Sequence, residues 1–122
     1  MSVTNPKQVA RLKRQKRIRK KTKGTTQRPR LCVFRSARHI YAQVIDDAAG
    51  QTLAAASSME ADVRQRDDFE NKVALAAHIG QLVGERARAK GVKQVVFDRN
   101  GFLYHGRIKA VSEGARKSGL DF

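Results

Sequence analysis

The hydrophobic positions of this chain follow two different periods. From residue 30 to residue 57, apolar and polar residues alternate in three segments, Arg30–Arg35, Ile40–Asp46 and an alanine-rich stretch, Gln51–Ser57. Short runs of turn-forming residues, 36–39 and 47–50, separate these segments. Alternation with period two is typical of strands, and short connections favour antiparallel neighbours. The sequence therefore predicts an antiparallel meander of three strands, the third the weakest.

The same alternation assigns side chains to the two faces of this sheet. Leu31 and Val33 share one face of the first strand, and Val44 lies in the all-aliphatic set of the second strand. If these aliphatic sets point to the core, Phe34 and Tyr41 lie on the opposite, less apolar face. Two alternatives stay open for Phe34: its ring faces a partner, or a second helix covers that face and buries it.

Beyond the meander the period changes to that of a helix. Asp67 and Asp68 offer an N-cap, and small and apolar residues recur at helical spacing until Gly91 supplies a C-cap. The small residues on this face would let the helix lie close to a sheet. Residues Lys93–Asp98 are predicted as a fourth strand and Gly106–Ser118 as a final helix.

The resulting order, β-β-β-α-β-α, predicts an α/β (α+β) fold with a mixed sheet. A helical crossover after the meander brings the fourth strand back parallel to one of the first three. The chain has 122 residues, which suits a single domain, since domains typically hold ~100–150 residues. Gly24 and Pro29 interrupt the sequence before the first strand. We therefore expect an N-terminal arm, residues 1–27, and one globular domain, residues 28–122.

Charge is concentrated in this arm and in the first strand. The chain has 26 Lys and Arg against 11 Asp and Glu, a net charge of +15. Residues 1–38 hold 14 of the basic residues and no acid, whereas residues 39–122 carry a net charge of only +1. A dense, acid-free array suits a phosphate backbone, where each neutralised phosphate releases counterions. We expect a nucleic-acid partner and an arm that is disordered, or helical when bound.

Composition disfavours several other classes of protein. No apolar run is long enough for a transmembrane helix, and the N-terminus lacks the apolar segment of a secretory signal. The single cysteine, Cys32, forms neither an internal disulfide nor a thiolate zinc site. The scattered aliphatic residues of the arm do not make the apolar stripe of a membrane-surface helix. We expect no cofactor, no metal, no membrane contact and no small-molecule substrate.

A nuclease is the main alternative, because the predicted element order also occurs in ribonuclease-H-like folds. Two-metal hydrolysis of a phosphodiester needs several carboxylates that converge on the ions. The first strand has none, Asp46 and Asp47 fall in a turn, and Asp98 is expected to stand alone beside Arg99. We therefore expect no catalytic residues and no enzyme. A DNA-binding architectural protein is the third hypothesis.

Two groups of residues are candidate binding sites. The first spans Phe34–Tyr41 and combines two aromatic rings with cations, a hydroxyl and an imidazole. Aromatic rings stack on unpaired bases while arginines engage phosphates, so this mixture is typical of RNA-binding sheets. The second spans Asp98–Lys109, where two glycines permit close approach of the backbone. Arg107 and Lys109 there begin a helix, where cations and free N–H groups favour a bound anion.

These segments resemble a known family. The runs RPRLCVFRS (28–36), HIYAQVIDD (39–47) and VFDRNGFLYHGR (96–107), the tail ARKSGL (115–120) and the basic arm are similar to bacterial large-subunit ribosomal protein eighteen, the universal uL18 type. The similarity runs essentially end to end. It implies a structural constituent of the large ribosomal subunit that binds 5S rRNA and helps attach it to 23S rRNA in the central protuberance. It also implies a ribonuclease-H-like translational-machinery fold without nuclease activity.

The resemblance further implies partners, a location and contact residues. The partners are 5S rRNA, 23S rRNA and neighbouring central-protuberance ribosomal proteins, and the location is cytoplasmic and ribosome-bound. Matching positions place the 5S contacts on the two groups above, with the arm laid along RNA. On charge and resemblance together, the expected RNA-binding residues are Lys7, Arg11, Lys13, Arg14, Lys16, Arg17, Arg19, Lys20, Lys21, Lys23, Arg28, Arg30, Phe34, Arg35, Ser36, Arg38, His39, Tyr41, Arg99, Tyr104, His105, Arg107 and Lys109.

Overall fold

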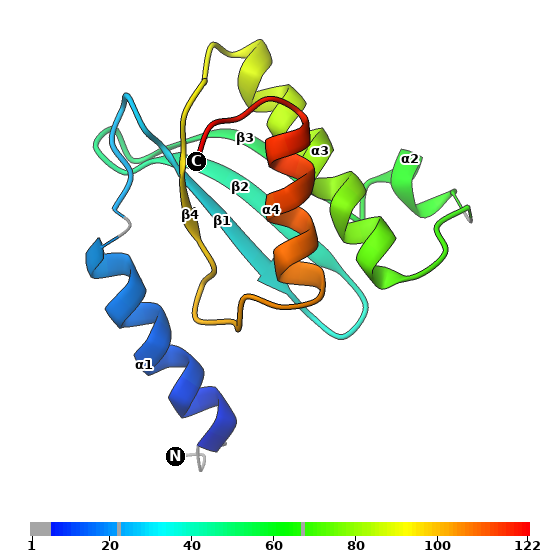
Figure 1. Ribbon diagram of the computed structural model, residues 1–122, viewed down its shortest axis with the longest axis horizontal. Coiled ribbons are helices and arrows are strands. Elements are labelled where there is room, and N and C mark those ends of the chain that lie inside the picture. The colour runs from blue at the N-terminus through cyan, green and yellow to red at the C-terminus, as the bar shows by residue number, and fades with distance from the viewer. Residues whose placement is uncertain (1–5, 22, 67) are drawn as a thin grey trace.

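The computed structural model describes residues 6–21, 23–66 and 68–122, and it contains a four-stranded sheet with helices on one side (Figure 1). Along the chain the elements are α1 (Pro6–Lys21), β1 (Arg30–Arg35), β2 (Ile40–Asp46), β3 (Gln51–Ser57), α2 (Ala61–Arg64), α3 (Lys72–Ala89), β4 (Val96–Asp98) and α4 (Arg107–Lys117). The three strands of the meander have the predicted bounds. The predicted α/β fold class is confirmed.

The sheet is mixed, with the strand order β3-β2-β1-β4. β1 pairs antiparallel with β2, and β2 pairs antiparallel with β3. β4 lies parallel to β1, with Arg30 opposite Val96 and Cys32 opposite Asp98. The crossover through α3 accounts for this parallel pair, because parallel neighbours cannot be joined by a tight turn.

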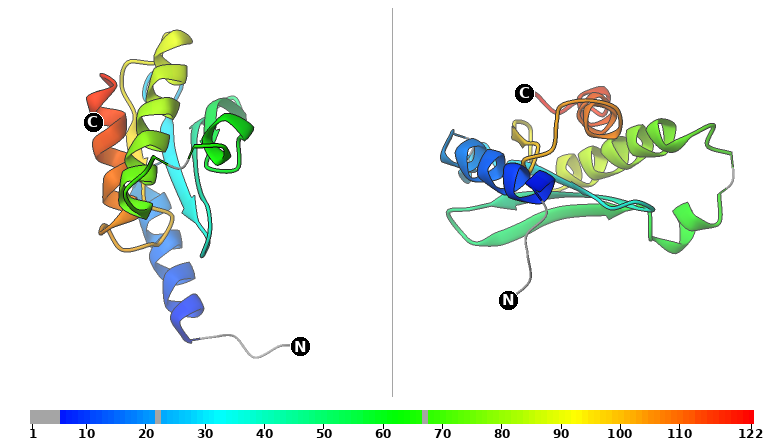
Figure 2. Two further views of the ribbon diagram at one scale, coloured as in Figure 1. Left: turned by 90° about the vertical axis from the view of Figure 1, so that its right-hand side faces the viewer. Right: turned by 90° about the horizontal axis from the view of Figure 1, so that it is seen from below.

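α3 and α4 cover the same face of the sheet (Figure 2). Leu31, Val33 and Val44 are fully buried beneath them. Phe34, on the other face, is 44% exposed. The predicted division of the two faces is therefore confirmed, and the alternative in which a helix buries Phe34 is wrong.

Close approach of α3 and α4 depends on glycine at their contact. A Cβ atom at Gly80 would lie 2.1 Å from the carbonyl oxygen of Val111, and one at Gly114 would lie 2.1 Å from the carbonyl oxygen of Ala77. Neither position has room for a side chain, since such distances are far inside van der Waals contact. Glycine in α3 thus serves its contact with α4, and α3 also packs on β2 and β3, as the sequence pattern predicts.

α3 begins later than the sequence predicts. Its N-cap is Asn71, whose side chain accepts a hydrogen bond from the backbone N–H of Ala74 at 2.9 Å. Asp68, one of the two predicted caps, instead pairs with Arg66 at 2.8 Å. Asp67 lies outside the described residues. Asn caps a helix as well as Asp does, so residue type alone does not show which of these residues precedes the first turn of α3.

Two smaller differences concern α2 and β4. The short helix α2 was not predicted; it follows Glu60, whose carboxylate accepts hydrogen bonds from Arg86 at 2.7 Å and from the N–H of Ser57 at 2.8 Å. β4 has only three residues, and Gln94 ahead of it forms an isolated bridge to Asp121. The predicted strand over residues 93–98 was therefore too long at its start.

The predicted arm contains α1, a helix of 16 residues. Pro6 stands at its first position, where a missing N–H costs nothing and the fixed φ suits a helix. Most of the following residues are Lys, Arg, Gln, Ala and Leu, which are good helix formers. The division into an arm, residues 1–27, and a domain, residues 28–122, stays a prediction.

Candidate nucleic-acid interface

α1 docks on the loop that follows β4 (Figure 1). The guanidinium of Arg11 donates a hydrogen bond to the carbonyl oxygen of Asn100, and that of Arg14 donates one to the carbonyl oxygen of Gly101, both at 2.9 Å. The side-chain amide of Gln15 donates to the side-chain oxygen of Asn100. Asn100 and Gly101 both have positive φ, and a Cβ atom at Gly101 would lie 2.3 Å from the backbone oxygen of Arg11. Only glycine at this position lets the helix come so near.

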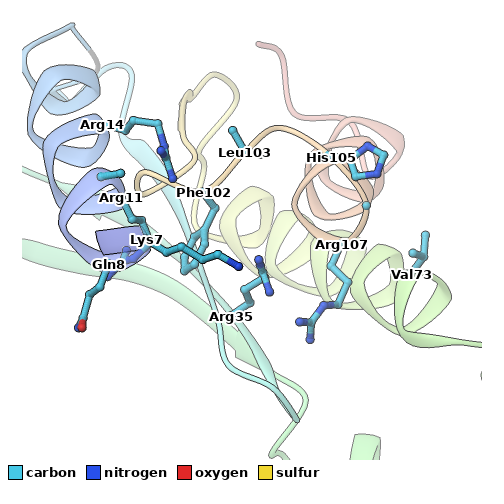
Figure 3. Close-up of a pocket in the computed structure, with 12 residues that line it drawn as sticks. Lys7, Gln8, Arg11, Arg14, Arg35, Val73, Phe102, Leu103, His105 and Arg107 are labelled. Atoms are coloured by element: carbon cyan, nitrogen blue, oxygen red, sulfur yellow. The ribbon is translucent and has the colours of Figure 1, made fainter. Parts of the chain in front are cut away.

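The docked helix completes a hollow of about 890 Å³, which we call the basic hollow (Figure 3). Its cations come from α1, from the end of β1 and from the start of α4. No Asp or Glu is among the described residues that line it. The lining residues are Lys7, Gln8, Ala10, Arg11, Arg14, Arg35, Val73, Phe102, Leu103, His105, Gly106 and Arg107.

Phe102 lies between two of these cations. The guanidinium carbon of Arg11 is 4.7 Å from the centre of the ring, and that of Arg35 is 5.0 Å from it. The negative face of an aromatic ring attracts cations, which favours this shared arrangement. Two arginines that are distant in the sequence therefore lie beside the same ring, and together they make this part of the hollow strongly positive.

Arg107 adds a further charge to the same place. Its guanidinium donates a hydrogen bond to the carbonyl oxygen of Ser36 at 3.1 Å. The pKa of Arg107 lies below its usual value, first because of burial and second because of the positive charge of Arg35. Cations held close together without a carboxylate between them favour a bound anion, which relieves their mutual repulsion.

A row of aromatic rings leads from the basic hollow onto the uncovered face of the sheet. The centre of the Phe34 ring is 5.9 Å from that of Phe102 and 5.9 Å from that of Tyr41. A shallow depression of about 320 Å³ lies beside them, lined by Cys32, Phe34, Tyr41 and Gln43. We call this surface the aromatic face. It offers ring surfaces and uncharged polar groups next to a strongly cationic site.

The connection between β1 and β2 is a tight loop with cations on its outside. The hydroxyl of Ser36 accepts a hydrogen bond from the backbone N–H of His39 at 3.2 Å, and the ring nitrogen Nδ1 of His39 lies 3.1 Å from the hydroxyl of Ser58. These contacts keep the loop compact. Arg38 is exposed on it, and Arg35 is exposed at the end of β1 beside it.

Arg30 and Asp98 are placed differently from the sequence prediction. The guanidinium of Arg30 forms a forked ion pair with Asp47, with two contacts of 3.0 Å, and a third contact of 2.8 Å with Asp98. Asp98 is fully buried and also accepts a hydrogen bond from the N–H of Asn100 at 2.8 Å. The expectation that Asp98 stands alone beside Arg99 was therefore wrong. Arg30 keeps 13% of its side-chain surface exposed, so its charge is largely engaged inside the protein.

The ion pair perturbs both partners. The pKa of Asp47 is lowered, first by the hydrogen bonds from Arg30 and also by that from the backbone N–H of Gly24. The pKa of Arg30 is raised, first by Asp47 and also by Asp98. Both groups are therefore charged at neutral pH.

The other predicted contact residues whose side chains the structure describes divide into three sets. Those at the basic hollow are Lys7, Arg11, Arg14, Arg35, His105 and Arg107, and those at or beside the aromatic face are Phe34, Ser36, Arg38, His39 and Tyr41. Outside the hollow lie Lys13, Lys16, Arg17, Lys23, Arg28, Arg99, Tyr104 and Lys109. The side chains of Arg19, Lys20 and Lys21 fall outside the described part of the chain.

Sequence reasoning missed Phe102 as a central residue of the site. It lies within the second candidate segment, Asp98–Lys109, but is not among the expected contact residues. An aromatic residue directly after Asn-Gly, in a segment rich in cations, was the available indication. Gln15 was also missed, because its part depends on the docking of α1.

Among the residues that the structure describes, no group of three or more His, Cys, Asp and Glu is placed to hold a metal ion. Within the same ranges, none of the helices has both the length and the apolar character needed to cross a membrane.

Comparison with known proteins decides the family. The model of the family described as ribosomal L18 of archaea, bacteria, mitochondria and chloroplasts matches residues 5–122. The chain belongs to this ribosomal L18 family. Large ribosomal subunit protein uL18 of Desulforapulum autotrophicum is 64% identical over 115 residues, 93% of each chain. The proteins of that name from Desulfosudis oleivorans and Thermotoga petrophila are 56% and 53% identical, over 100% and 95% of each chain.

Membership confirms the resemblance seen in the sequence. The ribosomal L18 family is structural and not enzymatic, so the chain is a constituent of the ribosome and not an enzyme. The nuclease alternative is therefore wrong. The buried ion pair of Arg30 with Asp98 fits this conclusion, because it occupies a carboxylate that a metal site would need free.

Proposed function

We propose that this ribosomal protein binds 5S rRNA in the large subunit and helps attach it to 23S rRNA in the central protuberance. The observation that carries the proposal is the basic hollow, where cations from separate elements surround Phe102 with no described carboxylate among them. Such a site suits a folded RNA, in which phosphates of neighbouring backbone segments come close together.

The aromatic face supplies the second part of the proposed contact. Phe34 is exposed near the end of β1 and Tyr41 is partly exposed near the start of β2, so the two rings flank Arg35 and the loop that carries Arg38. Unpaired bases stack on aromatic rings, and riboses pack against them, whatever the sequence of the RNA. Stacking beside a cationic hollow would favour an RNA loop or bulge over a regular duplex.

α1 supplies the third part. Lys13, Lys16 and Arg17 are exposed on it and do not line the basic hollow. In the proposed complex they neutralise phosphates along one strand, while Lys7, on the hollow side of the helix, faces the same phosphates as Arg107. Neighbouring ribosomal proteins and 23S rRNA would meet the surfaces that 5S rRNA leaves free.

The test is a comparison of binding to 5S rRNA and to duplex DNA of equal length, at physiological salt. We expect 5S rRNA to bind at least about 1,000-fold more tightly, which is the lower end of the usual ratio between specific and non-specific nucleic-acid binding. A pool of unrelated RNA of equal length is the control for charge alone. Equal affinity for all three nucleic acids would contradict the proposal and favour the general architectural role.

A further inference from the structure

We propose that Arg30, together with Asp47 and Asp98, is a positioning residue: it fixes α1 in its docked orientation, so that the arm meets RNA already in place. This inference rests on the proposed RNA-binding function. It replaces the expectation that Arg30 itself contacts RNA, since the contacts of its guanidinium are internal.

The first connection runs through Asp47 to the chain between α1 and the sheet. Asp47 accepts the fork of Arg30 and also a hydrogen bond of 2.6 Å from the backbone N–H of Gly24. Gly24 follows closely after the end of α1 at Lys21. A Cβ atom at Gly24 would lie 2.6 Å from the backbone nitrogen of Arg30, so the chain passes tightly against the start of β1. The C-terminal side of the arm is thereby tied to the sheet.

The second connection runs through Asp98 to the middle of α1. Asp98 accepts the remaining contact of Arg30 and the hydrogen bond from the N–H of Asn100. This second bond shapes the turn in which Asn100 has a φ of 55°. The carbonyl oxygens of this turn receive Arg11 and Arg14 of α1. One guanidinium is therefore linked to both places where the arm is anchored.

Two anchors fix the direction of a helix, whereas one would leave it free to swing. With α1 docked, Lys7 and Arg14 line the basic hollow together with Arg107. A partner that binds this surface does not have to order the arm, which lowers the entropic cost of association. If α1 were released, these cations would have to be gathered again on the RNA.

The direction in which one substitution changes RNA affinity distinguishes this positioning role from a simple effect of charge. Asp47 and Asp98 are the acids that contact Arg30, and acids near a binding surface oppose a polyanion. By charge alone, Asp47→Asn would tighten RNA binding. If Asp47 and Arg30 hold α1 in place, the same substitution weakens RNA binding.

We therefore expect Asp47→Asn to bind 5S rRNA about three- to tenfold more weakly at physiological salt. The slope of log K against log salt should fall by about 1–2, since each lost phosphate contact accounts for ~0.7–0.9. Asp62→Asn is the matched control, because Asp62 is exposed on α2, on the far side of the molecule from α1 (Figure 1). It removes the same charge and should leave binding unchanged or slightly tighter.

Arg30→Lys is the second variant. Lysine keeps the charge but has no planar fork for the carboxylate of Asp47. A positioning role predicts that Arg30→Lys loses as much affinity as Asp47→Asn, whereas a direct phosphate contact predicts affinity close to that of the unaltered protein. This variant also keeps a cation between the two carboxylates, so it tests the proposal if Asp47→Asn does not fold.

Amide hydrogen exchange over residues 6–21 of the full chain, without RNA, gives an independent measurement. Both variants should exchange faster than the unaltered protein in α1 and at the same rate in α3. If the unaltered protein fails to bind 5S rRNA but α1 is released as expected, the proposed function falls and the positioning role stands. Unchanged exchange in α1, or RNA binding by Asp47→Asn as tight as that of the unaltered protein, would overturn the inference.

Discussion

Arg107 donates a hydrogen bond to the carbonyl oxygen of Ser36, and this contact of 3.1 Å ties the start of α4 to the end of β1. The two residues are 71 positions apart in the sequence. Because the bond holds the guanidinium near Arg35, it concentrates positive charge at the edge of the basic hollow, where the pKa of Arg107 is lowered.

Arg107→Ala should weaken binding to 5S rRNA by about tenfold, because charged hydrogen bonds to a phosphate are among the stronger polar contacts. Arg116→Ala is the control on the same helix. Arg116 lies near the other end of α4, where its guanidinium donates to the carbonyl oxygen of Phe122 at 3.2 Å and lies 4.5 Å from the ring centre of that residue. Titration of labelled RNA measures both, and equal losses would argue against a local site.

Phe102→Leu should weaken RNA binding by about three- to tenfold. The substitution keeps an apolar side chain but removes the ring face that holds Arg11 and Arg35, and each such contact contributes about 0.5–1 kcal/mol. Phe122→Leu is the matched control, since it removes a similar contact with Arg116 at the far end of α4. RNA binding that falls equally in both variants would show that the loss comes from general destabilisation.

Gly80→Ala should destabilise the fold by about 1–3 kcal/mol, through overpacking against the backbone of Val111. The direction of the change in the free energy of unfolding is informative, because alanine in an open helix position stabilises by about 1 kcal/mol relative to glycine. Urea denaturation measures the free energy of unfolding. An unchanged or higher stability would mean that α3 and α4 separate without cost.

Stability should fall between pH 7.5 and pH 5.5 because of His78. Its pKa is lowered, first by burial and second by the charge of Arg66. Since the folded chain holds a proton there less readily than the unfolded chain, the contribution of His78 is complete above its ordinary pKa of about 6.5 and is lost as the pH falls below that value.

His78→Gln should therefore flatten the dependence of the unfolding free energy on pH in this window. The lowered pKa values of Asp47 and Glu60 act only in more acidic solution, because they lie below the ordinary values of Asp and Glu, which are about 3.9 and 4.3. Urea denaturation at both pH values measures the difference. An equal slope in the variant and the unaltered protein would assign the effect to other groups.

The sheet could be predicted closely because its determinants are local. Leu31 and Val33 alternate with polar neighbours, and the turn residues stand directly between the strands. The start of α3 was less predictable, since Asp67, Asp68 and Asn71 all suit an N-cap and only tertiary packing selects among them. Propensity thus located the helix but not its first residue.

The candidate site was predicted only in part, because its geometry comes from contacts between distant segments. Arg35 and Arg107 were each predicted as contacts, but nothing local shows that Phe102 lies among the cations. The ion pair of Arg30 with Asp98 arises from the parallel pairing of β4 with β1, which fixes the register of the two strands. The sequence shows that Arg30 is charged, but it does not show that its partners, Asp47 and Asp98, lie inside the protein.

The uncovered face of the sheet has a consequence for the isolated protein. With α3 and α4 on the opposite side, the ring of Phe34 is exposed to solvent and that of Tyr41 is partly exposed. Like charge keeps separate molecules apart, and salt screens that repulsion over a few ångströms. Concentrated salt should therefore promote self-association of the free protein through these rings, while the same salt also releases it from nucleic acid. Purification buffers have to balance the two effects.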